Sequence, residues 1–343
     1  MNTTIEEKKH PLATAAKIAT GAVGAVAALP FVAAGGWMLY SNTAINHKMP
    51  LPKAIDAERH NFFGKTTGHL SVYHDTGGSG RPLLLLHSVN AAASAYEMRP
   101  LFEHYRGTRP VWALDLPGFG FSERTDRVYT PMLYEHAILD TLDKIGEPAD
   151  VIALSLGCEF AARAALTHPD RFHTLTLISP SGFTSGEGKR ASQRAGQQEI
   201  GESIHRALAF PLWARPLFDL IATKRSIEFF LSQSFVGEPD SGMIAYAYIS
   251  AHQPGAEHAP LYFLSGQLFT RDVRERIYAH ATIPTQVLYD RDAFVSFEAL
   301  PAFIEARDEA RDNWRATRIT PTLGLPHFEK LDETVEALEA FWG

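Results

Sequence analysis

The sequence is poor in cysteine and has no excess of positive charge. Its 343 residues include a single cysteine, Cys158, which excludes an intramolecular disulfide framework and a zinc site built from cysteines. The 32 Lys and Arg residues are fewer than the 39 Asp and Glu residues, and the formal net charge is −7. Nucleic-acid binding is not expected, because it needs a basic surface that neutralises phosphates. A small or apolar partner is therefore expected. The sequence implies no metal or organic cofactor, and the oligomeric state stays open.

Charged residues are also absent from a long N-terminal stretch. Residues 18–46 contain no Asp, Glu, Lys or Arg, and Ala22–Tyr40 is close to the roughly 20 apolar residues that a membrane-spanning helix needs. We predict a single-pass transmembrane anchor at about residues 18–41, within an N-terminal tail of residues 1–47. A cleavable signal peptide and a helix that is buried or lies on a surface remain as alternatives. The lysines on the two sides of the segment differ too little in number to fix the orientation of the chain.

Beyond the tail, short apolar runs alternate with stretches of helix length. This alternation predicts an α/β fold with a mostly parallel sheet flanked by helices. Several runs are continuously apolar, as expected for strands that are buried on both faces. The expected strands are Leu70–His74, Pro82–His87, Val111–Leu114, Val151–Leu154, Leu175–Ser179, Gln286–Tyr289 and Ala316–Ile319.

The regular spacing of strands stops in the middle of the chain. Residues 204–221 instead show apolar patterning of helical length that Pro211 and Pro216 interrupt. We therefore predict a helical cap over residues 185–281, inserted into a core formed by residues 48–184 and 282–343.

The expected strand that ends at Leu154 runs directly into Ser155 and then into a helix rich in small residues. A sharp turn between a strand and a helix exposes a serine as a nucleophile only when small residues lie two positions before and after it. Ala153 and Gly157 meet this requirement, although Ala153 replaces the more usual glycine. The alternative interpretation is that Ser155 is an ordinary helix N-cap.

Five segments that include this turn resemble the α/β-hydrolase superfamily in their order and spacing. The resemblance extends from Leu70 to the C-terminus, except for the predicted cap. It implies the α/β-hydrolase fold and a triad in the order serine, acid, histidine. The matching segments are Leu-Leu-Leu-Leu-His-Ser-Val-Asn at 83–90, Asp-Leu-Pro-Gly-Phe-Gly-Phe-Ser at 115–122, the turn at 151–158, Asp-Arg-Asp-Ala-Phe-Val at 290–295 and Gly-Leu-Pro-His-Phe at 324–328.

A serine hydroxyl becomes a nucleophile at neutral pH when a histidine takes its proton and an acid orients that histidine. Of the 15 histidines, His327 follows the last expected strand, where the family has its base. The resemblance favours Asp292 as the acid. Asp290 remains the alternative, because the loop counted from the expected strand is one residue short.

The resemblance also implies an oxyanion hole made by two backbone N–H groups. These belong to Leu156, which follows the nucleophile, and to Val89, in a loop where Ser88 stands in place of the usual glycine. Cys158 is a second nucleophile by residue type, but its position inside the helix favours a packing role.

A serine at the turn favours acyl transfer to water over the branches of the family that use a carboxylate there. We therefore predict an esterase-type serine hydrolase that cleaves an ester-type acyl bond of a small or lipophilic substrate through an acyl-enzyme. The alternatives are a carbon–carbon hydrolase or lyase with the same triad and a non-catalytic, membrane-tethered binding protein. The apolar cap residues either bind a lipophilic acyl group or form the cap's own core. They are Phe210, Leu212, Trp213, Leu217, Phe218, Phe229 and Phe230.

Overall fold

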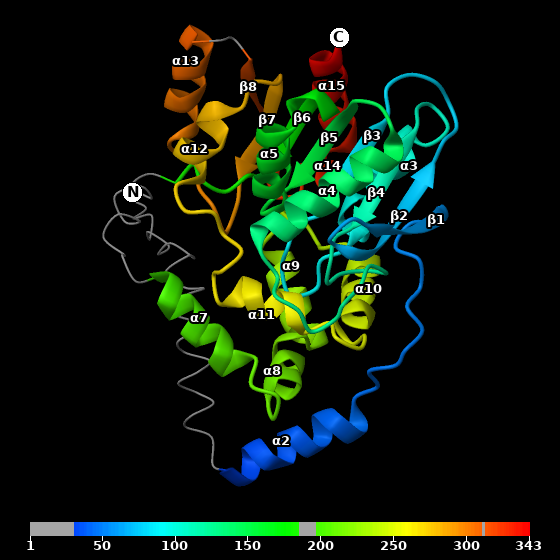
Figure 1. The fold of residues 1–343 in the computed structure, drawn as a ribbon, viewed down its shortest axis with the longest axis vertical. Coiled ribbons are helices and arrows are strands. Elements are labelled where there is room, and N and C mark those ends of the chain that lie inside the picture. The colour runs from blue at the N-terminus through cyan, green and yellow to red at the C-terminus, as the bar shows by residue number, and fades with distance from the viewer. Residues whose placement is uncertain (1–30, 185–196, 311–312) are drawn as a thin grey trace, which may run out of the picture.

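The computed structural model describes residues 31–184, 197–310 and 313–343. In these ranges the strands form one sheet in the order β1-β2-β4-β3-β5-β6-β7-β8 (Figure 1). β2 pairs antiparallel with β1 and β4, and every other neighbouring pair is parallel. The strands are β1 (Glu58–Gly64), β2 (Gly68–Asp75), β3 (Leu83–Leu86), β4 (Val111–Asp115), β5 (Ala149–Leu154), β6 (Phe172–Ile178), β7 (Thr285–Arg291) and β8 (Trp314–Leu323).

Helices cover both faces of the sheet, and further helices lie below one end of its strands (Figure 1). Those of the α/β part are α3 (Arg99–Tyr105), α4 (Pro131–Ile145), α5 (Gly157–Thr167), α13 (Leu300–Ala310), α14 (Pro326–Glu329) and α15 (Leu331–Trp342). The others are α2 (Phe31–Ala44), α7 (Gln197–Leu208), α8 (Ala214–Ile221), α9 (Lys224–Ser232), α10 (Ser241–Ala251), α11 (His258–Leu264) and α12 (Val273–Arg276). Three short 3₁₀ helices are η1 (Ala95–Met98), η2 (Pro169–Arg171) and η3 (Tyr278–His280).

The continuously apolar strands serve two hydrophobic cores at once. Successive side chains of a strand point to opposite faces, so Leu84 and Leu86 join the core under α4 and α5, while Leu83 and Leu85 join the core under α3 and α15. All four side chains are fully buried. The predicted mostly parallel sheet with helices on both faces is confirmed.

The strand β1 is not among the expected strands. β1 lies at the edge of the sheet, and its side chains alternate only between half-buried and exposed. A strand of this kind carries no apolar signal, since its pairing with β2 depends on backbone hydrogen bonds.

A buried carboxylate holds the Asp-x-Pro-Gly-x-Gly-x-Ser segment in its conformation. Asp115 accepts hydrogen bonds from the N–H groups of Ala95 (3.0 Å) and Phe121 (2.9 Å). Ser122 donates to the Asp115 carbonyl and accepts from the N–H of Ser71 on β2. One loop thereby joins three parts of the core.

The described part of the predicted cap, residues 197–281, consists of helices and connecting turns between β6 and β7. Of its apolar residues, Phe218 is fully buried in a small core of the cap. Phe210, Leu212 and Phe229 are exposed instead. The apolar residues of the cap therefore do not all serve its own core.

Of the predicted anchor, residues 18–30 lie outside the described residues, and residues 31–41 belong to α2. In the ranges that the structure covers, none of the helices combines the length and the apolar character needed to cross a bilayer. α2 instead packs on α8 of the cap, with the indole N–H of Trp37 donating to the Pro216 carbonyl (2.7 Å). The prediction of a spanning helix has no support in residues 31–41.

The loop around Asp115 gives a stability prediction. Gly120 has φ +51°, and a methyl group added there would lie 1.9 Å from the Asp115 Cγ atom. We expect Gly120→Ala to lower the free energy of unfolding by about 3 kcal/mol or more, from backbone strain and overpacking together.

Gly146→Ala is the matched control, because Gly146 has φ +88° and nothing within 4 Å of the added methyl group. It should lower the free energy of unfolding by only about 1–2 kcal/mol. Urea unfolding measures both variants, and equal losses would show that the contact with Asp115 contributes nothing.

Candidate active site

Ser155 occupies a sharp turn between β5 and α5. Its φ is +51°, a left-handed conformation that is unfavourable for a residue with a side chain, and its N–H donates to the carbonyl of Ile178 (2.8 Å). A methyl group added at Gly157 would lie 2.5 Å from the His87 carbonyl oxygen. The N-cap position of α5 is Leu156, and no side chain caps the helix there. Ser155 is therefore in a strained turn and not in an ordinary cap.

His327 lies in the short helix α14, directly after β8, and its side chain is fully buried. The Nε2 atom is 2.6 Å from the backbone carbonyl oxygen of Glu97. Nδ1 has no hydrogen-bond partner among the described residues. Burial lowers the pKa of His327 to about 4, although the Glu97 carbonyl opposes this shift. The ring is neutral at pH 7, and in this position it is hydrogen-bonded to Glu97 and not to Ser155 or Asp292.

The two candidate acids have different surroundings. Asp290 belongs to β7, and its carboxylate accepts from Arg318 Nε (2.7 Å) and from the N–H of Thr322 (2.9 Å). Burial raises the pKa of Asp290, but these two donors outweigh it and the net shift is downward. Both of its oxygens are thus occupied by partners around β8.

Asp292 is the first residue after β7. Its Oδ1 atom accepts from the N–H groups of Phe294 (2.7 Å) and Val295 (3.3 Å). A methyl group added at Gly324 would lie 3.0 Å from its Oδ2 atom, so this oxygen contacts the loop that begins three residues before His327. Burial raises the pKa of Asp292 against the opposing effect of the two N–H groups and the Ser179 hydroxyl.

The 3₁₀ helix η1, which follows the loop after β3, contains a carboxylate that the sequence does not single out. Glu97 is buried, and it accepts from the Ser88 N–H (2.8 Å) and from Asn90 Nδ2 (3.0 Å). Burial raises the pKa of Glu97, while these donors lower it. The sequence offered one signal for a buried role of Glu97, which is that it is the only carboxylate in an apolar stretch just after the loop. Since Glu97 uses the Ser88 N–H, that group is not available to an oxyanion.

The two predicted oxyanion donors are free in the described part of the chain. Neither the Leu156 N–H nor the Val89 N–H donates to an acceptor there. Parallel pairing sets Leu86 of β3 beside Ala153 of β5, and this places the loop after β3 next to the turn at Ser155. The arrangement leaves two donors close to the predicted nucleophile.

Two other residues near the turn have structural roles. His87 Nε2 accepts from the Leu116 N–H (3.0 Å), and its Nδ1 lies 2.5 Å from the Ser88 carbonyl oxygen. The Cys158 thiol faces the carbonyl oxygens of Ala153 (3.1 Å) and Ile178 (3.5 Å), and burial raises its pKa well above the usual range. A thiol that stays protonated is a poor nucleophile, which supports the packing role expected for Cys158.

The cap contacts the loop that carries His327. Glu329 accepts from the N–H of Val236 in the cap (2.5 Å) and from the N–H of Leu323 at the end of β8 (2.8 Å). The rings of Phe235 and Phe328 pack edge to face at 5.9 Å. In the described ranges, no three His, Cys, Asp or Glu side chains converge to hold a metal ion. A hollow of about 390 Å³ between β8 and α15 is lined by none of the candidate site residues.

The chain is similar to hydrolases of known name. A 2-hydroxymuconate semialdehyde hydrolase of Pseudomonas sp. (strain CF600) is 34% identical over 116 residues, which are 32% of this chain and only 40% of that enzyme. A pimeloyl-(acyl-carrier protein) methyl ester esterase of Aliivibrio salmonicida (strain LFI1238) is 24% identical over 255 residues, which are 69% of this chain and 88% of the esterase.

A solved structure and a family profile extend the similarity over most of the chain. The crystal structure of a serine hydrolase involved in carbazole degradation superimposes with a TM-score of 0.61 at 16% identity, covering 83% of this chain and 99% of that one. The sequence profile of the Alpha/beta hydrolase family matches residues 83–337, from β3 to α15. The match covers well over half of the chain, and the chain therefore belongs to the alpha/beta hydrolase family.

Proposed function

We propose that this hydrolase cleaves an ester-type acyl bond of a small or lipophilic substrate through an acyl-enzyme on Ser155. The observation that carries the proposal is the left-handed backbone of Ser155 in the turn between β5 and α5. Strain of this kind persists where the surrounding structure imposes it, and it is concentrated at functional sites. The methyl ester esterase to which the chain is similar supports ester chemistry.

In this mechanism Ser155 Oγ attacks the acyl carbon while His327 takes the hydroxyl proton. The N–H groups of Leu156 and Val89 stabilise the negative oxygen of the tetrahedral intermediate. His327 then returns the proton to the leaving alkoxide, which departs as an alcohol. A water molecule, deprotonated by His327, attacks the acyl-enzyme and releases the carboxylic acid and Ser155.

The mechanism requires the His327 ring to leave the Glu97 carbonyl. Nε2 must accept from Ser155, whereas in the observed position it is placed to donate to Glu97. Nδ1 must donate to a carboxylate, and its lack of a partner leaves it available for Asp292. We propose that substrate binding under the cap draws the ring toward Ser155.

Two apolar cap residues outside its core, Phe229 and Phe230, support a lipophilic acyl group. We also propose that the enzyme associates with a membrane through its N-terminal part, as the uncharged segment of residues 18–46 predicts. An enzyme at a membrane meets lipophilic esters at high local concentration.

Labelling with a fluorophosphonate probe tests the serine mechanism. The wild-type protein should be labelled on the peptide that contains Ser155, and Ser155→Ala and His327→Ala should abolish the labelling. Peptide mapping locates the adduct, and circular dichroism shows whether each variant is folded. A folded wild-type protein that takes no label would favour the non-catalytic binding protein instead.

Replacing each candidate acid by its amide distinguishes the two aspartates. Asp292→Asn should lower kcat by about 10³–10⁴-fold, because the histidine loses the partner that sets its tautomer. Asp290→Asn should leave kcat within a few-fold and lower the unfolding midpoint, because Asp290 holds Arg318 and the Thr322 N–H. The reverse pattern would make Asp290 the acid.

The pH dependence of kcat/KM follows from the burial of His327. The base must be neutral to accept a proton, and its pKa is lowered to about 4 from the usual 6.5. The rate should therefore stay constant as the pH falls through 6.5 and decline only as it approaches the lowered pKa. Ester hydrolysis is measured at each pH where near-ultraviolet circular dichroism is unchanged. A decline centred at or above 6.5 would contradict this prediction.

Carbon–carbon bond hydrolysis is the second candidate function. It is favoured by the 34% identity to a 2-hydroxymuconate semialdehyde hydrolase, although that match covers only 40% of the relative. Both chemistries need the same serine, so labelling does not separate them. Turnover of 2-hydroxymuconate semialdehyde compared with p-nitrophenyl esters of increasing chain length does.

A further inference from the structure

An exposed apolar surface lies at the end of the molecule farthest from the sheet's helices α13 and α15 (Figure 1). We call it the cap-end face and define it by Leu39, Tyr40, Phe210, Leu212 and Leu220. Leu39 and Leu212 are the most exposed of the five, at 66% and 63%. The first two residues belong to α2, the next two precede α8, and Leu220 is in α8. α2 and α8 are in direct contact, which brings these residues to the same end of the molecule.

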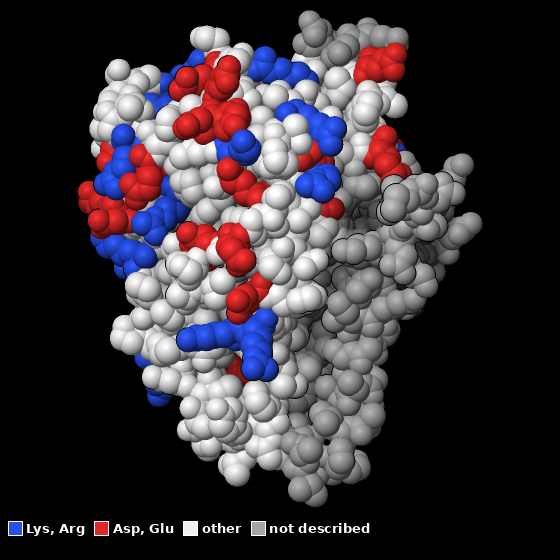
Figure 2. All heavy atoms as spheres, turned by 180° about the vertical axis from the view of Figure 1, so that it is seen from behind, with Lys and Arg blue, Asp and Glu red and all other residues white. Residues whose placement is uncertain are grey.

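The segments that build the cap-end face have no unpaired charge. Residues 18–46 contain no charged side chain, and residues 207–223 contain only Arg215 and Asp219. These two form an ion pair (3.1 Å), and Asp219 is fully buried. Figure 2 shows the same contrast among the described residues on one side of the molecule, where red and blue groups are scattered over the upper and middle parts and the lower end is white. The face can therefore leave water without burying an isolated charge.

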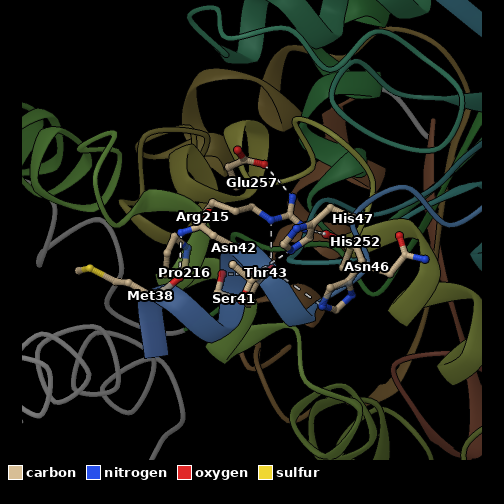
Figure 3. A network of polar contacts seen from close by, with 12 residues as sticks. Met38, Ser41, Asn42, Thr43, Asn46, His47, Arg215, Pro216, His252 and Glu257 are labelled. Atoms are coloured by element: carbon tan, nitrogen blue, oxygen red, sulfur yellow. Dashed lines mark hydrogen bonds and ion pairs between the residues drawn. The ribbon is translucent and has the colours of Figure 1, made fainter. Parts of the chain in front are cut away.

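α2 is fixed to the cap by a buried polar network (Figure 3). Asp219 accepts from the Ser41 hydroxyl (2.6 Å), and its carboxylate is 2.9 Å from His47 Nε2. Arg215 extends the network to the Gln253 carbonyl (3.0 Å) and to Glu257 (2.9 Å). The network holds one side of α2 against α8, and Leu39 and Tyr40 remain on the outer side. The apolar side chains of the face are thus presented by a firmly held structure.

Basic residues occur where the chain enters and leaves these segments. Lys48 follows α2, Arg206 lies near the end of α7, and Lys224 and Arg225 begin α9; all four side chains are exposed. Glu202 of α7 and Glu228 of α9 are exposed as well, but they lie farther along the chain from the uncharged segments. Cations beside an apolar surface match a bilayer with anionic headgroups, because the apolar side chains enter the acyl boundary while the cations stay among the phosphates.

We propose that the cap-end face docks on the surface of a lipid bilayer that contains anionic lipids. In the sequence, α2 belongs to a longer stretch, residues 18–46, that contains no charged side chain. A bilayer therefore matches both the face and the segment before it. The proposal gives the membrane association proposed above a definite surface, and it does not depend on which bond the enzyme cleaves.

The single buried cysteine makes a direct test possible. Cys158 is fully buried, so an introduced surface cysteine is the only one that reacts in the folded protein. We would attach an environment-sensitive fluorophore to the full chain at Leu39→Cys, Leu212→Cys and Phe63→Cys. Phe63 is the matched control, because it is 80% exposed and lies on the edge strand β1.

Vesicles of phosphatidylcholine with phosphatidylglycerol are then added to each labelled protein. We expect a blue-shifted and brighter emission at positions 39 and 212 and no change at position 63, with a weaker response to phosphatidylcholine alone. An equal response at all three positions, or none, would overturn the proposal. A shift that grows with protein concentration without vesicles would identify a second copy of the chain as the occupant.

Charge substitutions test whether the face contributes to binding. The pair Leu212→Asp and Leu220→Asp should lower the vesicle-bound fraction at equilibrium by about tenfold or more, whereas Phe63→Asp should not change it. Unchanged binding of the double variant would show that other residues hold the protein on the membrane and would overturn the proposal. Fluorophosphonate labelling of the same samples shows that the variants are folded and reports the serine chemistry separately.

Discussion

The close approach of the turn at Ser155 to the end of β3 is the contact on which the rest of the site depends. Because β3 pairs parallel with β5, the His87 carbonyl oxygen lies only 2.5 Å from the position that a Cβ atom on Gly157 would take. Position 157 therefore requires glycine. The backbone of Ser155 leaves the strand in the same turn, with a positive φ. The same approach sets the Val89 loop beside the Leu156 N–H. The proposed nucleophile and the proposed oxyanion donors thus lie on elements that one backbone contact positions.

Carboxylates hold the loops of this protein where small disulfide-rich folds use disulfides. The buried Asp115 ties the loop after β4 to η1, the buried Glu97 ties the loop after β3, and the half-buried Glu329 ties the cap to the loop of His327. Asp219 does the same for α2 and the cap. A carboxylate accepts several hydrogen bonds at once, and pairing with N–H groups offsets the cost of burying it. The loops around Ser155 are therefore ordered although the chain has one cysteine.

The position of His327 links the cap to the proposed chemistry. The ring is fully buried and hydrogen-bonded to Glu97, and the cap contacts its helix through Glu329 and Phe328. If the cap-end face rests on a bilayer as proposed, the cap that contacts the helix of His327 also contacts lipid.

The sequence alone determined the strands of the sheet other than β1, the turn at Ser155 and the position of His327 after the last strand. Apolar runs, small residues and motif order are local signals. The sequence left the choice between Asp292 and Asp290 open. The two carboxylates differ in their surroundings, because Asp290 pairs with β8 and Asp292 contacts Gly324. Both contacts arise only when β7 folds against β8. Glu97, β1 and the docking of α2 were missed for the same reason. Each depends on partners distant in the chain, Glu97 on His327 and Ser41 on Asp219, and only tertiary structure brings such partners together.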